Sequence, residues 1–266
     1  MVAARAVCRE RLGRRRLPSG VVGDRPDSVP VDGMPCAHLR AALARAIGIG
    51  HDTDTVAAIA GALLGARWGA SAVPAEWLRV LHGYPGLTGE RLVELATLAA
   101  GRGPDRQGWP GVDRLDYGVH LGGEPVLVQH PLDDGVWLGD IRALGALSPG
   151  ADAVVSLCRM GRAEVPDGVE SVVFRLIDSV DPAANPNLAF VLKDAAETVR
   201  ALRAQGRGVL RHRVAAQSRT PAVAAAYALL LGHGESGVNA KLAALPSQQM
   251  NSAFRRALEE MSASGW

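Results

Sequence analysis

The most chemically informative part of the sequence is a short loop that joins an apolar strand to a helix, Val209-Leu210-Arg211-His212-Arg213-Val214-Ala215-Ala216-Gln217-Ser218-Arg219-Thr220-Pro221. A helix that begins at Thr220 or Pro221 points its free backbone N–H groups toward this loop. The loop can also turn its own N–H groups inward, and together these groups would make a nest for an anion. Arg219 adds a guanidinium that can hold two phosphate oxygens at once. The alternative is a plain strand–loop–helix connection with a surface Arg.

A second candidate site lies at the start of another helix, where carboxylates gather. Asp52, Asp54 and Thr55 offer three oxygen ligands within four residues, just before an Ala-rich stretch. Hard divalent cations such as Mg²⁺ prefer oxygen donors. Asp and Thr are also ordinary helix caps, and Asp54 or Thr55 would cap the helix over residues 56–68, so the spacing alone leaves both interpretations open.

Two further residues have weaker claims to a role. Trp137 is either a platform for a ligand or a core aromatic side chain. Arg159, which follows a predicted strand, either assists anion binding or is a surface residue.

The elements that must position these residues change character along the chain. Ala- and Leu-rich segments punctuated by Gly and Pro predict four helices in the first part, over residues 38–47, 56–68, 75–81 and 90–100. The second part alternates short apolar runs with helical stretches. Its predicted strands are residues 125–129, 136–138, 153–158, 172–177 and from 208, and its predicted helices are residues 141–147, 188–204, 221–231, 238–245 and 251–261. Such alternation favours a mainly parallel sheet flanked by helices.

We therefore expect an α plus α/β chain with four regions. These are a disordered basic, Pro- and Gly-rich tail (1–35), an all-helical fragment (36–100), a linker (101–123) and a sheet-containing domain (124–266). The net charge of +2 gives no reason to expect a nucleic-acid or membrane partner. Three widely spaced cysteines suggest neither a disulfide framework nor a zinc site, and favour a reducing cytoplasmic setting.

The helical fragment resembles the C-terminal part of ADP-ribosylglycohydrolases. The resemblance covers roughly residues 35–100 and is carried by Gly50-His51-Asp52-Thr53-Asp54-Thr55, the Ala-rich helix, and Gly69-Ala70-Ser71-Ala72-Val73-Pro74-Ala75-Glu76-Trp77. It implies that Asp52, Asp54 and Thr55 are metal ligands, with Mg²⁺ as the cofactor. The family also needs a Ser/Thr-Asp-Asp cluster that does not precede Gly50 here. We expect a weak, incomplete metal site and no glycohydrolase activity from this chain alone.

The second part resembles dual-specificity phosphatases, over roughly residues 125–261. The loop is similar to their His-Cys-x₅-Arg-(Ser/Thr) signature. The resemblance implies that Arg219 is the phosphate-binding Arg, that Thr220 is the following hydroxyl, and that Asp181 or Asp178 is the general acid. Either Asp is alternatively a turn residue. The implied phosphate-binding residues are Arg213, Val214, Ala215, Ala216, Gln217, Ser218 and Arg219.

The sequence departs from that family at the nucleophile, because Arg213 stands at the cysteine position. A guanidinium stays protonated and cannot attack phosphorus, and Ser218 would need an activating base. Arg213 either strengthens anion attraction or fills the pocket. The main hypothesis is a catalytically impaired, phosphatase-like hydrolase that binds phosphate or a phosphorylated protein. The alternatives are an active phosphatase, if Arg213 is an error or is bypassed, and a module that acts on ADP-ribosylated partners through the helical fragment.

Overall fold

The computed structural model describes residues 34–101, 103–118, 121–122, 124–148, 150–216, 218–233 and 250–264. Almost all of the predicted tail, the predicted helix over residues 238–245, and Gln217 lie outside these ranges. Within them, no helix is both long and apolar enough to cross a membrane.

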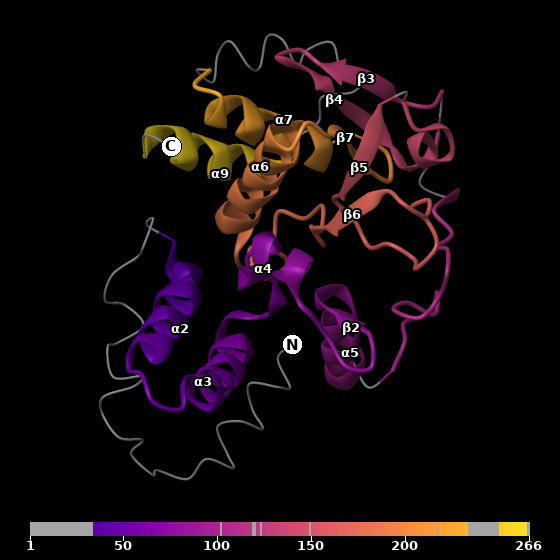
Figure 1. The fold of residues 1–266 in the computed structure, drawn as a ribbon. Coiled ribbons are helices and arrows are strands. Elements are labelled where there is room, and N and C mark those ends of the chain that lie inside the picture. Colours follow the sequence, from indigo (N-terminus) through magenta and orange to yellow (C-terminus); the bar gives the residue numbers. More distant parts are fainter. Residues whose placement is uncertain are drawn as a thin grey trace.

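The first part is helical, as the sequence predicts (Figure 1). Its elements are η2 (Pro35–Ala37), α2 (His38–Gly48), α3 (Thr53–Trp68), η3 (Ala70–Ala72), α4 (Ala75–Val80), a small hairpin of β1 (His82–Gly83) and β2 (Leu87–Thr88), and α5 (Gly89–Gly101). The hairpin was not predicted from the amino-acid pattern. Gly89 is needed where α5 meets α4, because a Cβ atom there would lie 2.5 Å from the Leu78 carbonyl oxygen.

The predicted cap of α3 is wrong. Asp54 or Thr55 was expected to cap the helix, but α3 begins at Thr53 and its N-cap is Asp52, whose side chain makes no capping hydrogen bond. The backbone N–H of Val56 already donates to the Asp52 carbonyl, so the helical pattern starts one turn earlier. Asp54 therefore lies in the first turn, where a negative charge is favourable to the helix dipole.

The second part contains a five-stranded sheet of β3 (Leu127–His130), β4 (Asp133–Asp140), β5 (Ala151–Ser156), β6 (Glu170–Val173) and β7 (Gly208–Arg213). The strand order is β3-β4-β7-β5-β6. All pairs are parallel except β3 with β4, which confirms the mainly parallel sheet predicted from the sequence. β7 lies in the centre, and every one of its residues is buried.

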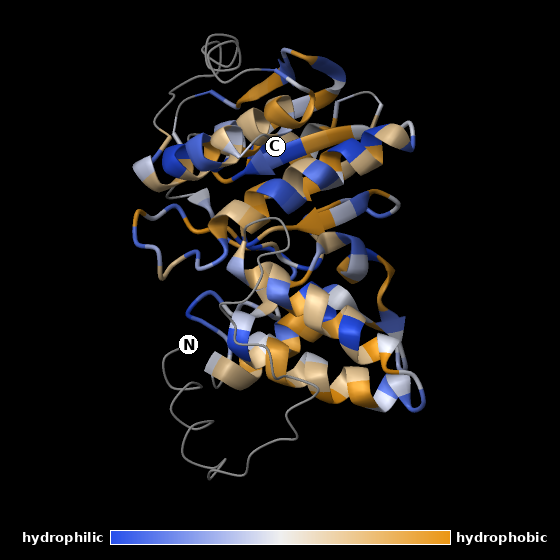
Figure 2. Cartoon of the chain, turned by 90° about the vertical axis from the view of Figure 1, so that its left-hand side faces the viewer, coloured by the Kyte–Doolittle hydropathy of each residue, from blue (hydrophilic) through white to orange (hydrophobic). Residues whose placement is uncertain are grey.

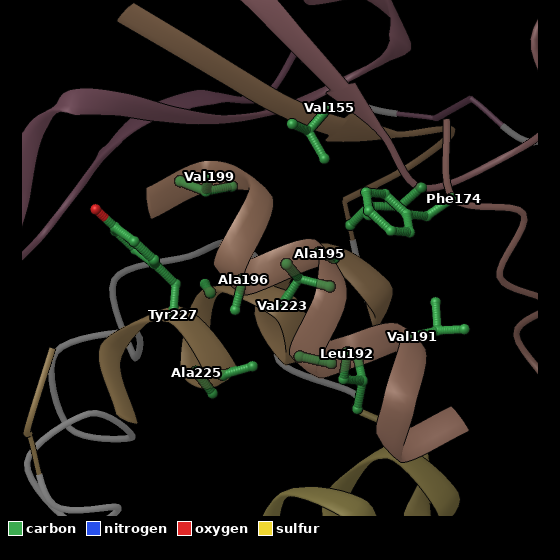
Figure 3. Packing of buried hydrophobic residues seen from close by; sticks show 14 of the residues in the cluster. Val155, Phe174, Val191, Leu192, Ala195, Ala196, Val199, Val223, Ala225 and Tyr227 are labelled. Carbon is green, nitrogen blue, oxygen red and sulfur yellow. The ribbon is translucent and has the colours of Figure 1, made fainter. Parts of the chain in front are cut away.

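Three helices, α6 (Leu188–Ala204), α7 (Arg219–Leu230) and α9 (Ser252–Ala263), contribute to the main core. Figure 3 shows side chains of α6, α7 and β5 meeting in this core. The many alanines on α6 and α7, such as Ala195 and Ala225, let the two helices pack closely. A second, smaller core lies around η5 (Ile141–Ala146) and includes Leu210, while Val209 faces the main core, as expected for alternating strand residues.

The helical part packs around a smaller core and leaves several large apolar side chains exposed. Its buried side chains include Leu39, Ala60 and Leu64. Ile47, Ile49, Ile59 and Val80 are more than half exposed. The hydropathy colouring of Figure 2 shows apolar residues along these helices. The helices of this part are therefore not fully covered by the described residues.

Candidate functional site: the loop before α7 and its cleft

The loop Val214–Ser218 connects the end of β7 to the first turn of α7, at the carboxyl edge of the parallel strands. Its described residues are mostly buried, and Ala216 adopts a left-handed conformation with φ of 52°. That conformation sharply turns the backbone, as nests for anions require. Ser218 is the N-cap of α7, so the free N–H groups of the helix start lie at this loop. Gln217 lies outside the described residues.

Arg213 ends β7 and points its guanidinium to an acidic side chain. Its Nη1 donates to Asp178 Oδ2 at 2.7 Å, and the side chain is only 6% exposed. Burial and the neighbouring Arg219 lower the pKa of Arg213, and Asp178 opposes that shift. The Nε atom is buried and has no hydrogen-bond partner among the described residues.

Arg219 begins α7 and reaches across the loop. Its Nη1 donates to the carbonyl oxygens of Leu157 at 3.0 Å and Leu176 at 2.6 Å. These bonds hold the guanidinium against the ends of β5 and of the segment after β6. Burial lowers the pKa of Arg219. Its Nε is also buried without a partner in the described part of the chain.

The structure separates the two acid candidates. Asp178 lies beside the loop, where Asn251 Nδ2 also donates to its Oδ1 at 2.8 Å. Asp181 is exposed and accepts from the backbone N–H of Ala183, the bond typical of an Asx turn. Asp178 is therefore the carboxylate next to the loop, and Asp181 is occupied locally in a turn.

Among the described residues, no base contacts the hydroxyl groups of the loop. His212 is fully buried and pairs through Nε2 with Ser156 Oγ at 2.9 Å, and burial lowers its pKa to about 4. Ser218 Oγ instead accepts from the backbone N–H of Asn251 at 3.2 Å. Thr220 Oγ1 is buried with no partner among the residues that the structure describes. No described contact would remove a proton from Ser218.

Cys158 is a neighbour of the loop. It follows β5 in the chain and lines the same cavity as Arg213 and Arg219. Burial raises the pKa of its thiol to about 11, although both guanidinium groups act in the opposite direction. The thiol is therefore protonated at neutral pH. The parallel register brings the end of β5 beside the end of β7 and explains this proximity.

A cleft of about 930 Å³ extends from the loop to the helical part. The sheet-containing part contributes the loop residues Arg213, Val214, Ala215 and Arg219, with Asp178 and the segment around β6. The helical part contributes the end of α3, α4 and α5, including Trp68, Leu78 and Val93. Figure 1 shows α4 next to one end of α6, at the junction of the two parts.

Polar contacts hold the two walls of this cleft together. Asp194 of α6 accepts from the backbone N–H of Ala75 at 2.8 Å, at the start of α4. Asn187 donates to the Trp68 carbonyl at 2.9 Å and to Ser71 Oγ at 2.8 Å. Two ion pairs, Arg79 with Glu170 and Arg175 with Glu90, join α4 and α5 to the region of β6.

The candidate metal ligands do not form such an enclosed site. Asp52, Asp54 and Thr55 are all exposed, and a hydrogen bond with Asp52 lowers the pKa of Asp54. Among the described residues, no group of three or more His, Cys, Asp or Glu could hold a metal ion. Two exposed carboxylates and a hydroxyl do not fit a complete Mg²⁺ centre.

Trp137 and Arg159 also have places in the structure. Trp137 packs against the smaller core, as expected for the core interpretation. Arg159 lines the cleft, pairs with Asp105 and lies over the Trp109 ring at 5.3 Å from its centroid.

The central strand β7 of the mainly parallel sheet thus leads through the loop into α7. The first part matches the family model of ADP-ribosylglycohydrolase over residues 26–107, a minority of the chain. This match confirms the resemblance expected there. A comparison with curated proteins gave no match.

The solved structures that the chain resembles are dual-specificity and tyrosine phosphatases. Human DUSP28 is 23% identical, with a TM-score of 0.46 over 54% of this chain and 96% of that chain. A mouse putative dual specificity phosphatase complexed with zinc tungstate is 22% identical, with a TM-score of 0.44 over 54% and 93%. The human tyrosine phosphatase-like serine/threonine/tyrosine-interacting protein is 19% identical, with a TM-score of 0.43 over 50% and 93%. At these identities the likenesses describe the fold.

Proposed function

We propose that this chain binds a phosphate group at the loop before α7 and does not hydrolyse it. The observation that carries the proposal is the pair of guanidinium groups of Arg213 and Arg219. Each has a buried Nε without a partner in the described residues, and both line one cleft. Buried donors are costly to leave unpaired, and phosphate oxygens are the acceptors that Arg binds best.

The surroundings of the loop support anion binding. The N-terminus of α7 adds partial positive charge, and the left-handed Ala216 turns the loop backbone around it. The carboxylate of Asp178, which belongs to the same chain, already pairs with Arg213. A phosphate group would replace this carboxylate as the partner of Arg213, so Asp178 acts as an internal competitor.

The same contacts argue against turnover. The likeness of the loop to the His-Cys-x₅-Arg-(Ser/Thr) signature implies that Arg213 stands at the position of the attacking cysteine, and a protonated guanidinium has no free electron pair to attack phosphorus. Ser218 has no described base, because His212 is engaged with Ser156. Cys158 lines the cleft, but its raised pKa keeps the thiol protonated. Binding without hydrolysis is the function that remains.

Calorimetry with orthophosphate tests the binding. We expect the wild-type chain to bind, and Arg219→Met to weaken the affinity at least about tenfold, because a charge-assisted contact of about 1.5–3 kcal/mol is lost. The matched control is Arg200→Met, an exposed Arg on α6 that does not line the cleft. Absence of binding by the wild type, or equal affinities of all three chains, would contradict the proposal.

A phosphatase assay with 4-nitrophenyl phosphate tests the absence of turnover. We expect no hydrolysis by the wild type and measurable hydrolysis by Arg213→Cys, because a thiol beside Arg219 and a helix N-terminus has a lowered pKa. Phosphatase activity that co-purifies with the wild-type chain, or a covalent phospho-adduct on that chain, would show that the chain is an active phosphatase.

A further inference from the structure

We infer that the ligand is a small phosphomonoester with an apolar body the size of one or two aromatic rings. Its phosphate would lie at the loop and its body in the cleft that the helical part closes. This inference rests on the proposed phosphate binding and adds the class of ligand to it.

The size and lining of the cleft favour a small molecule. Its volume of about 930 Å³ lies within the range of roughly 300–1,000 Å³ that is usual for small-molecule sites. Such sites combine mainly apolar walls with a few polar groups that orient the ligand. Here the apolar wall comes from both parts of the chain: Val73, Leu78, Val93, Phe174, Leu176 and Ile177.

Five Arg side chains line the cleft, together with the carboxylates of Glu90, Asp178 and Asp194 and several uncharged polar side chains. Arg175 joins Arg213 and Arg219 as a third cleft residue whose Nε is buried without a described partner. Its guanidinium also lies over Trp109, at 5.7 Å from the ring centroid. Trp68 and Trp109 both line the cleft. A ligand with an anionic head and a flat apolar body fits this combination of cations, indoles and aliphatic side chains.

The contacts between the two walls argue against a phosphorylated protein as the ligand. A folded partner would have to place its phosphate in the cleft that α4 and α5 line. These helices are fixed to the sheet-containing part by Asp194, by Asn187 and by the ion pairs of Arg79 and Arg175. Opening the cleft would break several of these contacts at once, whereas a small molecule leaves them intact.

The experiment compares four probes on the full chain by calorimetry: orthophosphate, 1-naphthyl phosphate, 1-naphthol and a phosphotyrosine peptide of about six residues. We expect 1-naphthyl phosphate to bind about 100-fold more tightly than orthophosphate, since roughly ten buried carbon atoms each add about 0.3 kcal/mol. Quenching of tryptophan fluorescence by 1-naphthyl phosphate would place the ring system near Trp68 and Trp109. The peptide should bind more weakly than 1-naphthyl phosphate.

Two variants test the apolar walls. Leu78→Ala, on the helical side, and Ile177→Ala, on the sheet side, should each reduce the affinity ratio of 1-naphthyl phosphate to orthophosphate about fivefold, because each removes roughly 1 kcal/mol of apolar contact. Ile177 is 54% exposed, so its substitution tests the wall even if Leu78→Ala fails to fold. Leu92→Ala is the matched control, as Leu92 is exposed on α5 and does not line the cleft.

The outcomes separate this inference from the proposed function. If orthophosphate binds but 1-naphthyl phosphate binds no more tightly, the phosphate site stands and the small-ligand inference is overturned. If the phosphotyrosine peptide binds most tightly, the ligand is a phosphoprotein and the inference is again overturned. If 1-naphthol binds as well as its phosphate, the cleft does not recognise the phosphate group of such a ligand and the inference is overturned. If no probe binds, both the inference and the proposed function are wrong.

Discussion

The helices α3 and α7 begin with the two sets of residues whose chemistry stands out in the sequence, and their environments differ. At α3, Asp52, Asp54 and Thr55 are exposed, and no third acidic, His or Cys side chain completes a metal site among the described residues. At α7, the loop is mostly buried between the central strand and the helix, and Arg213, Arg219 and Asp178 surround it.

The difference lies in how the two candidate sites are assembled. The α3 candidate supplies its oxygen ligands from one short segment and lacks described neighbours, whereas a metal cage draws its ligands from several segments. The α7 candidate is framed by β7, the loop and α7, which are consecutive in the chain. A site framed by consecutive residues therefore needs fewer contributions from distant segments than a metal cage does.

The largest expected effect concerns the free-energy cost of burying a charged side chain in β7. The carboxylates at the start of α3 are exposed and have no such cost. Arg211 is fully buried, and its three guanidinium nitrogens have no partner among the described residues. Arg211→Met should raise the free energy of unfolding by about 3 kcal/mol at pH 7, because it removes an unpaired buried charge. Urea denaturation measures this change.

The pH dependence gives this prediction a second test. Burial lowers the pKa of Arg211 to about 9. The unfolded chain therefore keeps the Arg211 proton up to a higher pH than the folded chain does. Below pH 9, Arg211 is charged in both states, and the full cost of burying its charge lowers the free energy of unfolding. As the pH rises above 9, the folded chain loses this proton and the cost decreases. The advantage of Arg211→Met should shrink between pH 8 and pH 10.5. Arg200→Met, an exposed control on α6, should stay within about 0.5 kcal/mol of wild type. A destabilised Arg211→Met chain would show that Arg211 has a partner.

The second prediction concerns the junction between the two parts. Burial raises the pKa of Asp194 to about 7, although the backbone N–H of Ala75 favours its ionised form. An acid with a raised pKa destabilises the fold once it ionises, so stability is lost as the pH rises from about 4 to 7. Asp194→Asn keeps an acceptor for Ala75 and should stabilise the chain by about 2 kcal/mol at pH 8, with little effect at pH 4. Thermal denaturation at the two pH values measures this, and equal shifts at both would contradict it.

The third prediction concerns the internal competitor at α7. Asp178→Asn removes the negative charge that pairs with Arg213, so orthophosphate should bind about tenfold more tightly, the equivalent of about 1.4 kcal/mol. Asp181→Asn is the matched control, because Asp181 is exposed in a turn outside the cleft. Calorimetry on both variants compares the two carboxylates. An equal gain in orthophosphate affinity in the two variants would mean that only the overall charge of the chain matters.

The smallest effect is expected at α3. Mg²⁺ at 5 mM should shift the Tm by less than about 1 °C, because two exposed carboxylates provide few of the ligands that a dehydrated cation needs. Asp54→Asn should leave that small response unchanged. Micromolar Mg²⁺ binding that Asp54→Asn abolishes would show that the α3 site is complete and would remove the contrast with α7.

Much of the fold was predictable because it depends on local pattern. The Ala-rich stretches, the Gly stops and the apolar runs gave α6 over its full length, and they placed all five strands within a few residues. The hairpin at residues 82–88 was missed because its strands are two residues long. The N-cap of α3 was misplaced because several Asp and Thr residues compete for that position.

The site was only partly predictable, because its walls come from distant segments. The consecutive residues from Arg213 to Arg219 were identifiable by type and spacing. The choice between Asp178 and Asp181 depended on which of them reaches Arg213, and three residues of sequence separation do not decide that. Arg175 and the α4–α5 wall were not anticipated as cleft residues, since only the sheet order and the docking of the helices bring them to the loop.

Asn251 connects the loop to the last described helix in a way that makes the two interdependent. One side chain caps α9 through Oδ1 and donates through Nδ2 to Asp178, while its backbone N–H donates to Ser218. An anion that displaces Asp178 from Arg213 would therefore also disturb the start of α9. By thermodynamic reciprocity, any change that stabilises the position of α9 also keeps the Asp178 carboxylate in place and weakens anion binding at the loop. Hydrogen exchange in the first turn of α9 would then act as a remote reporter of occupancy at the loop.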